Sequence, residues 1–388
     1  MITQLKIENF LSLKDIDIEF GLNNIFVGPN MSGKSNIIHA LKFLTNISVA
    51  GLNSAVISRG GFSELLWKGI DEGRIYFWVR TKIVNETNEL TFYEYELALE
   101  GSARSGLGIF EIEHETLTRF SGDNAYLLGE FRKGRGKGLH QDGSIAFEQK
   151  EVQQKSFLEY SVPGWEGMVA KYFISSWRFY HLFPYTMRRD KSISEQLFLN
   201  EWGDNLPEWL LTLQTRYRDE WIRLEQAVRD VLPEIDYVMT PLTQVGTTSV
   251  LLKEKLLKRP IGSRQISDGT LQFLALLSLI FAPPDLGAPI FCIEEPENHL
   301  HPRLMESLIQ LLQQRQQELG NRAAQLFITT HYPYLIDIVS IEELIAVVKS
   351  AGATECFRPA EKTYLHDILR KGELTLSDLW YSGALGDK

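Results

Sequence analysis

Nine consecutive residues near the N-terminus carry the clearest chemical signal in this sequence. Residues 28–36 read Gly-Pro-Asn-Met-Ser-Gly-Lys-Ser-Asn and match the phosphate-binding pattern G-x-x-x-x-G-K-[ST] in full. Glycines let such a loop curl with its N–H groups turned inward, and the positive end of the following helix dipole favours an anion. The pattern predicts a polyphosphate site; the alternative is a glycine-rich strand-to-helix turn that binds nothing.

Particular residue types in this loop have particular roles in the predicted site. Lys34 is expected to reach the β- and γ-phosphates of ATP, and Ser35 is expected to ligate Mg²⁺. ATP and Mg²⁺ are therefore the expected ligands. The predicted nucleotide-binding residues of the loop are Gly28, Pro29, Asn30, Ser32, Gly33, Lys34, Ser35 and Asn36.

A pair of carboxylates follows an apolar run in the last third of the chain. Residues 290–293 are Ile-Phe-Cys-Ile, typical of a buried strand, and Glu294 and Glu295 come directly after them. Ligands of open α/β sheets bind at the carboxyl ends of strands, and successive strand residues point to opposite sides. We assign Glu294 to Mg²⁺ and Glu295 to orienting or deprotonating the attacking water. The alternative is that both glutamates are merely the first charges of a helix.

Two further segments are candidates for the same chemistry. Ser267 and Gly269 precede an apolar helix and would place a hydroxyl, N–H groups and the helix dipole at a second anion site. A plain capping turn is the alternative there. His331 follows a predicted strand and would contact the γ-phosphate or position water, unless it is purely structural. Lys34, Glu295 and His331 are thus the predicted catalytic residues.

The hydrophobic pattern predicts the elements that position these residues. Residues 24–27 form a short apolar strand, and 36–44 repeat apolar side chains every three or four positions, so the phosphate loop joins a strand to a helix. Strand and helix patterns alternate again in the last third of the chain, which predicts an α/β fold with a mixed, mostly parallel sheet and flanking helices. The strands are expected at 289–293, 325–329 and 344–348, and the helices at 271–281 and 303–319.

The middle of the chain predicts two inserted parts. Residues 75–79 and 90–97 alternate apolar and polar side chains, which indicates an antiparallel β lobe. Apolar residues recur every three or four positions over 204–231 and predict one amphipathic helix of about 25 residues, capped by Asp204 or Asn205. The expected segments are 1–60 (N-terminal half of the core, with the phosphate loop), 61–170 (β lobe), 171–260 (helical insertion) and 261–388 (C-terminal half of the core).

Composition limits the partners of this protein. The formal net charge of −10 argues against a surface that is basic throughout, so nucleic-acid contact would have to come from a local patch. Residues 132–138 supply four positive charges in seven residues, which either follow a nucleic-acid backbone or form a solvated loop. No apolar run is long enough to span a membrane, and Cys292 and Cys356 form no disulfide framework. We therefore expect a cytoplasmic protein with no membrane partner.

The order of these motifs resembles the ABC-type ATPase heads of the SMC, RecF and OLD families, and most of all the stand-alone ATPases of the RecF-like AAA group. Glu294 stands where such heads usually have aspartate, and Ser-Asp-Gly-Thr stands where ABC proteins usually have Ser-Gly-Gly-Gln. The resemblance is carried by 5–10 (Leu-Lys-Ile-Glu-Asn-Phe), the phosphate loop, 267–271 (Ser-Asp-Gly-Thr-Leu), 294–302 (Glu-Glu-Pro-Glu-Asn-His-Leu-His-Pro) and 329–331 (Thr-Thr-His).

This resemblance implies a P-loop NTPase of the ABC-ATPase head type that forms an ATP-dependent homodimer. Ser267 and Gly269 of one subunit would contact the γ-phosphate that lies on Lys34 and Ser35 of the other, with His331 as the switch histidine. The implied function is an ATP-dependent dimerisation switch in DNA repair or in defence against foreign DNA.

Two other functions remain open at this point. The chain could be the ATP-gating subunit of a nuclease complex; the stretch after His331 is too short for the nuclease domain that OLD relatives append, so we expect a separate effector protein in that case. A transporter ATPase subunit is the third reading, and it is disfavoured by the departure from Ser-Gly-Gly-Gln at 267–270.

Overall fold

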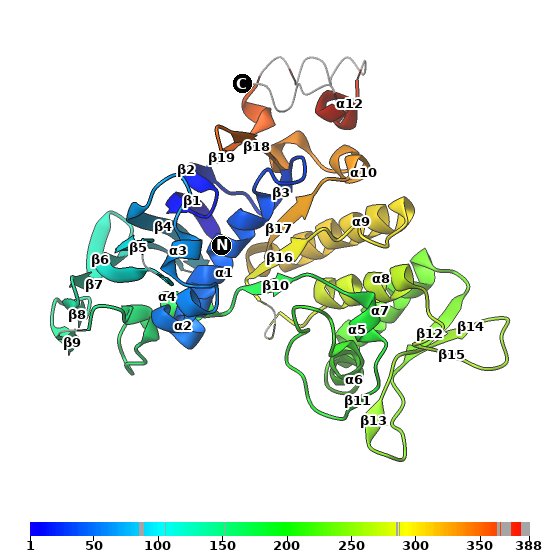
Figure 1. Cartoon of the computed structure of the whole chain (residues 1–388). Helices are drawn as coiled ribbons and strands as arrows, with labels where there is room; N and C mark the ends of the chain where they lie inside the picture. The colour runs from blue at the N-terminus through cyan, green and yellow to red at the C-terminus, as the bar shows by residue number, and fades with distance from the viewer. Residues whose placement is uncertain are drawn as a thin grey trace. The chain divides into compact units, whose positions relative to one another are not determined.

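The computed structural model describes residues 1–84, 89–104, 106–150, 152–284, 286, 288–362, 365 and 374–381. These residues form two units, and each is described by itself. The first contains Met1–Trp177 and the segment that begins at Glu342, and the second contains Arg178–Ile341 and the helix α12 (Leu376–Tyr381) (Figure 1). The four-part division expected from the sequence stays a prediction.

An eight-stranded antiparallel sheet is the largest element of the first unit. Its strand order, β2-β1-β4-β5-β6-β7-β8-β9, joins the N-terminal hairpin and the predicted β lobe in one sheet (Figure 1). Ile75, Phe77 and Val79 of β4 are buried and the residues between them are partly exposed, as alternation along a half-buried strand requires. The strands are β1 (Ile2–Phe10), β2 (Leu13–Glu19), β4 (Glu72–Val84), β5 (Leu90–Ser102), β6 (Ile109–Ser121), β7 (Asn124–Arg132), β8 (Arg135–Leu139) and β9 (Ile145–Gln149).

A second strand group in the first unit carries the phosphate loop. The group consists of β3 (Asn23–Val27), β18 (Leu344–Ser350) and β19 (Ala353–Phe357), and the loop leads from β3 into α1 (Lys34–Ala50). β3 pairs with β18 in parallel, and β18 pairs with β19 antiparallel. The rings of Phe10, Phe43 and Phe77, with centroids 5.1, 5.5 and 5.6 Å apart, pack α1 against the antiparallel sheet. The predicted strand, loop and helix are therefore confirmed.

The second unit has its own parallel strands. β16 (Ile290–Glu294) lies between β10 (Arg178–Tyr180) and β17 (Gln325–Thr330), and all three run in parallel. Every residue of β17 is buried, and its centre, Leu326 to Ile328, is apolar, as expected of a strand covered on both faces. The helices α8 (Asp268–Ile280) and α9 (Pro302–Leu319) precede and follow β16 in the chain. The predicted alternation of strands and helices is confirmed.

The structure corrects the single long helix expected over 204–231. Two helices, α6 (Leu206–Arg216) and α7 (Arg218–Val231), are separated at Tyr217, whose φ of −121° and ψ of 66° are not helical. No proline or glycine marks this break, so its cause lies in tertiary packing. Trp209 of α6 donates a hydrogen bond to Ser278 Oγ of α8 at 3.1 Å, whereas α7 packs against β12 (Ile235–Met239).

Several short elements complete the two units. Within the part of the chain that the structure describes, no helix has the length and apolar character needed to cross a membrane. The short elements of the first unit are α2 (Leu52–Ile57), α3 (Phe62–Leu65) and α4 (Met168–Ser175). Those of the second unit are α5 (Pro184–Met187), β11 (Lys191–Ser192), β13 (Thr247–Thr248), β14 (Leu251–Glu254), β15 (Ile261–Gly262) and α10 (Pro333–Asp337).

A buried carboxyl group ties the antiparallel sheet to the segment that follows β9. Glu115 of β6 is fully buried, and its Oε1 accepts hydrogen bonds from Ser156 Oγ and, at 2.7 Å, from Tyr95 Oη. Its Oε2 accepts a hydrogen bond from the Phe157 N–H at 3.1 Å. Burial raises the pKa of Glu115 to about 8, against the opposing effect of these donors. The folded chain therefore holds a proton here that the unfolded chain releases.

We predict that Glu115 makes the fold less stable as the pH rises from about 5 to about 8. The unfolded carboxyl releases its proton near its ordinary pKa of 4.5, whereas the folded carboxyl keeps it until about 8, so stability is largest below 4.5 and is lost through this window. Glu115→Gln should remove this pH dependence. The measurement is the free energy of unfolding by denaturant for both proteins at the two ends of the window. Parallel pH curves would contradict the assignment.

Candidate nucleotide-binding site

Two glycines of the phosphate loop lie where no side chain fits. A Cβ on Gly28 would lie 2.3 Å from the carbonyl oxygen of Val347 in β18. Gly33 has a φ of +107°, which disfavours other residues, and a Cβ there would lie 1.9 Å from Thr354 Oγ1 in β19. The backbone therefore curls between β3 and α1 with its main chain packed directly against the neighbouring strands.

The polar groups of this loop fit a polyphosphate. Lys34 is buried, and its Nζ donates to the carbonyl oxygens of Gly28 at 2.8 Å and Pro29 at 3.1 Å. Ser32 Oγ is buried and, within the described residues, has no hydrogen-bond partner. Phosphate oxygens would satisfy this hydroxyl and would bind the lysine more strongly than neutral carbonyls do. Asn30 is exposed at the loop, and Ser35 is half-buried.

The second unit brings Glu295 and His331 together at the ends of β16 and β17. Glu295 Oε1 lies 3.5 Å from His331 Nδ1, and its Oε2 accepts a hydrogen bond from Asn298 Nδ2 at 3.1 Å. The main-chain N–H of Glu295 donates to the Thr329 carbonyl at 3.0 Å. Glu295 has a φ of +46°, an uncommon conformation for a side-chain-bearing residue that often marks functional sites. The strand ends thus place a carboxylate and an imidazole within reach of one water molecule.

Glu297 also belongs to this cluster; it is part of the 294–302 motif, but the sequence assigned it no role. Its Oε1 accepts hydrogen bonds from Thr330 Oγ1 at 2.6 Å and from the main-chain N–H of His331 at 3.4 Å. The same oxygen lies 3.9 Å from His331 Nδ1. Burial raises the pKa of Glu297. The sequence shows Glu297 as a third carboxylate close to Glu294 and Glu295, but the hydrophobic pattern does not predict that its side chain is buried.

Ser267 and Gly269 form a helix-capping turn at the start of α8. Ser267 Oγ accepts a hydrogen bond from the Thr270 N–H at 3.1 Å, which is the capping alternative considered above. Gly269 is needed for close packing, because a Cβ there would lie 2.5 Å from the His299 carbonyl oxygen. Asp268 forms an ion pair with Arg188 at 2.5 Å. An anion-binding role for this turn stays a prediction.

The predicted site residues fall into two sets, one in each unit. The phosphate loop belongs to the first unit, whereas Ser267, Gly269, Glu294, Glu295 and His331 belong to the second. Among the described residues, no group of three or more His, Cys, Asp or Glu side chains is arranged to hold a metal ion. Magnesium is usually held by one or two carboxylates together with phosphates and water, so the proposed Ser35 and Glu294 ligands do not require such a group.

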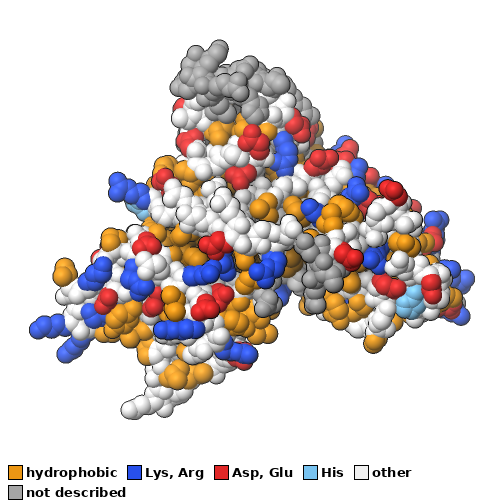
Figure 2. Space-filling model, turned by 180° about the vertical axis from the view of Figure 1, so that it is seen from behind, with side chains coloured by type: hydrophobic (Ala, Val, Ile, Leu, Met, Phe, Trp, Pro, Cys, Tyr) orange, Lys and Arg blue, Asp and Glu red, His pale blue; other side chains and the backbone are white. Residues whose placement is uncertain are grey.

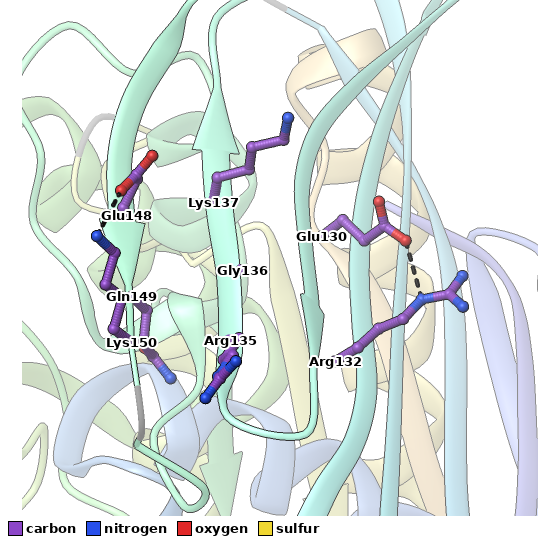
Figure 3. Close-up of a pocket in the computed structure, with 8 residues that line it drawn as sticks. All are labelled: Glu130, Arg132, Arg135, Gly136, Lys137, Glu148, Gln149 and Lys150. Carbon is purple, nitrogen blue, oxygen red and sulfur yellow. Dashed lines mark hydrogen bonds and ion pairs between the residues drawn. The ribbon is translucent and has the colours of Figure 1, made fainter.

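The basic run expected at 132–138 forms the hairpin of β7 and β8. Lys133 and Gly134 both have positive φ, 47° and 76°, as a tight two-residue hairpin turn requires. A cavity of about 620 Å³ lies beside this hairpin (Figure 3). Ion pairs to acidic neighbours reduce its positive charge: Arg132 to Glu130 at 2.9 Å and Lys150 to Glu148 at 3.6 Å. The cavity is lined by Glu130, Arg132, Arg135, Gly136, Lys137, Glu148, Gln149 and Lys150.

A second cationic hairpin, which the sequence analysis did not identify, connects β14 and β15. Residues 253–259 contain Lys253, Lys255, Lys258 and Arg259 against one acid, Glu254. Residues 255–260 are exposed, and Leu256 is 97% exposed. No ion pair is found for the three cations of 255–259 among the described residues, in contrast to the β7–β8 hairpin.

The fold of this chain is similar to that of SMC head domains. An SMC head bound to the C-terminal winged-helix domain of ScpA has a TM-score of 0.57 and 14% identity, over 92% of this chain and 97% of that one. The SMC head domain of Thermotoga maritima has a TM-score of 0.50 and 14% identity, over 92% and 98%. An SMC head of Pyrococcus furiosus bound to the C-terminal domain of ScpA has a TM-score of 0.52 and 12% identity, over 95% and 99%. At this identity the likeness establishes the fold.

The sequence also identifies the family. Residues 24–337 match the family described as "AAA domain, putative AbiEii toxin, Type IV TA system", and the chain belongs to it. No curated protein matches the chain. The predicted α/β fold and the resemblance to the SMC- and RecF-like group of ABC ATPases are both confirmed.

We predict that Gly33→Ala abolishes nucleotide binding while Gly143→Ala does not affect it. Both glycines have positive φ, +107° and +85°, so both variants carry backbone strain of about 1–2 kcal/mol. At Gly33 the added methyl group would also collide with Thr354 Oγ1, whereas at Gly143 no atom of the described residues beyond its two chain neighbours lies within 4 Å of the added carbon. Calorimetric titration with ATP, alongside thermal unfolding, tests this prediction. Equal affinities in the two variants would contradict the cradle assignment.

Proposed function

We propose that this protein is a magnesium-dependent ATPase that works as an ATP-dependent dimerisation switch. The observation that carries the proposal is the phosphate loop, in which the buried Ser32 hydroxyl has no partner among the described residues and Lys34 donates to neutral carbonyl oxygens. Both groups would gain strong partners from a polyphosphate. Membership of the AAA family and the SMC head fold support nucleotide binding and hydrolysis as the activity.

We assign the roles in hydrolysis to the residues that the sequence motifs single out. Lys34 would neutralise charge on the β- and γ-phosphates, and Glu295 would orient and deprotonate the attacking water. His331, 3.5 Å from Glu295, would hydrogen-bond the γ-phosphate or the same water. Magnesium, held by Ser35 and Glu294, would stabilise charge on the phosphate oxygens. Glu297 would hold His331 in place by accepting a hydrogen bond from the main-chain N–H of His331.

The proposed dimer gives the turn at the start of α8 a role. Ser267 and Gly269 would bind the γ-phosphate held by Lys34 and Ser35 of a second copy, using the start of α8 as the donor end. The absence of a side chain at Gly269 lets the turn pack closely on the His299 carbonyl, and Asp268 forms an ion pair with Arg188. ATP would then close the dimer, and hydrolysis would reopen it.

We place the switch in defence against foreign DNA or in DNA repair, in the cytoplasm. The family description names a toxin of a type IV system, which supports the defence setting. Two of the similar SMC heads are bound to ScpA, which supports a separate effector protein as a partner of this chain. An ATP-gating subunit of a nuclease complex is the alternative; a transporter subunit is disfavoured.

Nucleic acid would contact this protein through a local cationic hairpin. On the face shown in Figure 2, described basic side chains are interspersed with acidic and hydrophobic ones and form no continuous basic surface. The predicted patch at 132–138 offers cations beside a cavity, with two of the lining cations engaged by glutamates. The β14–β15 hairpin offers exposed cations that no acid of the described residues pairs, which makes it the stronger candidate.

We predict opposite defects for two variants of the proposed ATP site. Lys34→Ala should weaken ATP binding by about tenfold or more, because the variant cannot form the charge-assisted bond to phosphate. Glu295→Gln should bind ATP normally, lower the hydrolysis rate roughly 100-fold or more, and accumulate as an ATP-bound dimer. Binding titration, phosphate release and light scattering with and without ATP distinguish these outcomes. Wild-type protein that neither binds nor hydrolyses ATP would falsify the proposed function.

We predict that the two cationic hairpins contribute unequally to nucleic-acid binding. Replacing Lys255, Lys258 and Arg259 together by serine should weaken binding and lower the slope of log affinity against log salt by about 0.9 for each phosphate that is no longer neutralised. Replacing Arg135 and Lys137 by serine should have a smaller effect. Fluorescence anisotropy with labelled single- and double-stranded DNA at several salt concentrations measures both. A larger effect of the second variant would reverse the assignment, and no binding by the wild type would point to a protein partner.

A further inference from the structure

A chain of hydrogen bonds links the phosphate loop to two distant segments of the first unit. Asn36 Nδ2 donates to Ser12 Oγ at 2.7 Å, Ser12 Oγ lies 2.6 Å from Thr354 Oγ1, and Thr354 Oγ1 donates to the Ser32 carbonyl oxygen at 2.8 Å. Thr354 is buried in β19, and Ser12 lies in the turn between β1 and β2. The main-chain N–H of Thr354 also donates to the Ser12 carbonyl at 2.8 Å.

The chemistry of its two ends fixes the direction of this chain. An amide nitrogen can only donate, and a carbonyl oxygen can only accept. Thr354 must therefore donate its one hydroxyl proton to the Ser32 carbonyl. Ser12 must then donate its own hydroxyl proton to Thr354 Oγ1. Every hydroxyl in the chain both accepts and donates, an arrangement in which neighbouring hydrogen bonds strengthen one another.

The end of this chain controls which way one peptide group of the loop faces. In a planar trans peptide the C=O and the following N–H point in opposite directions. Because Thr354 holds the Ser32 carbonyl on the side of β19, the Gly33 N–H points to the other side. That is the orientation in which main-chain N–H groups of such a loop can face a phosphate.

Glycine makes this control necessary. Gly33 tolerates φ values on both sides of zero, so the same freedom that allows the cradle also allows the Ser32–Gly33 peptide to rotate. A rotated peptide would aim a carbonyl oxygen at the phosphate and repel it. Thr354 Oγ1 lies where a Gly33 side chain would be, 1.9 Å from the position of an added Cβ, so it fills the space that the glycine leaves.

We propose that Thr354, oriented by Ser12, is a positioning residue that fixes the Ser32–Gly33 peptide for nucleotide binding. The hydroxyl of Thr354 supplies orientation, and it touches no substrate atom. This role rests on the proposed ATP site, because it concerns how the phosphate loop meets its ligand. It makes the β1–β2 turn and β19 part of the nucleotide-binding apparatus.

The test compares Thr354→Val, which keeps the shape and removes the hydroxyl, with Thr354→Ser, which keeps the hydroxyl. ATP titration and steady-state hydrolysis are measured on the full chain, with thermal unfolding as the check on folding. Thr354→Val should raise the dissociation constant and KM for ATP about fivefold to tenfold and leave kcat within about twofold, because ground-state and transition-state binding are weakened alike. Thr354→Ser should restore wild-type values.

Each alternative outcome decides against the proposal or against its premise. Unchanged ATP affinity in Thr354→Val, or an equal loss in Thr354→Val and Thr354→Ser, overturns the positioning role. If Thr354→Val does not fold, Ser12→Ala decides: it removes the orienting donor, and affinity equal to that of the wild type overturns the role. Wild-type protein that does not bind ATP overturns the proposed function itself, which separates that failure from failure of the positioning role.

Discussion

Main-chain N–H groups can hold an anion only where the carbonyl groups of the same loop face elsewhere. In this phosphate loop four carbonyls are engaged by donors of the chain itself. Lys34 Nζ donates to the carbonyl oxygens of Gly28 and Pro29. Thr354 Oγ1 donates to the Ser32 carbonyl, and the Asn36 N–H donates to the Gly33 carbonyl at 3.0 Å. Of these donors, Lys34 is the one with a flexible side chain and a charge, so a polyphosphate can draw it from the carbonyls to its own oxygens. The Ser32 and Gly33 carbonyls are bound by donors of the fold itself.

This constraint explains why the strands that follow Glu342 belong to the same unit as the N-terminal segment. β18 pairs in parallel with β3 and thereby brings the Val347 carbonyl against Gly28, leaving no room for a side chain. β19 then places Thr354 against Gly33, and the β1–β2 turn supplies Ser12. The conformation of the loop therefore depends on β18 and β19, which lie far from it in the sequence, and on the β1–β2 turn. The helix α1 that starts at the loop is in turn fixed by the aromatic contacts of Phe10, Phe43 and Phe77.

The local parts of this arrangement could be predicted from the sequence, and the long-range parts could not. The phosphate loop, its strand and its helix follow from nine residues and the hydrophobic period around them, and the strand ends with Glu294 and His331 follow from buried runs. The partnership of Ser12 with Thr354 joins residues 342 positions apart, and no local pattern encodes it. The helix break at Tyr217 carries no proline or glycine, and the burial of Glu297 depends on its bond to Thr330. Each of these features is decided by tertiary packing.

The position of Glu295 depends on its own backbone conformation rather than on strand alternation. Alternation along a strand separates the predicted roles of Glu294 and Glu295, but β16 ends at Glu294, so alternation does not govern the next residue. Glu295 instead adopts a φ of +46°, held by its N–H bond to the Thr329 carbonyl. This conformation costs roughly 1–2 kcal/mol for a residue with a side chain, and glycine would avoid that cost. A carboxylate here lies 3.5 Å from His331, so the strain is coupled to an acid–base pair that glycine could not form. The unfavourable backbone conformation at Glu295 thus coincides with a side chain that lies beside His331, whereas in the phosphate loop Gly28 and Gly33 stand where a side chain would not fit.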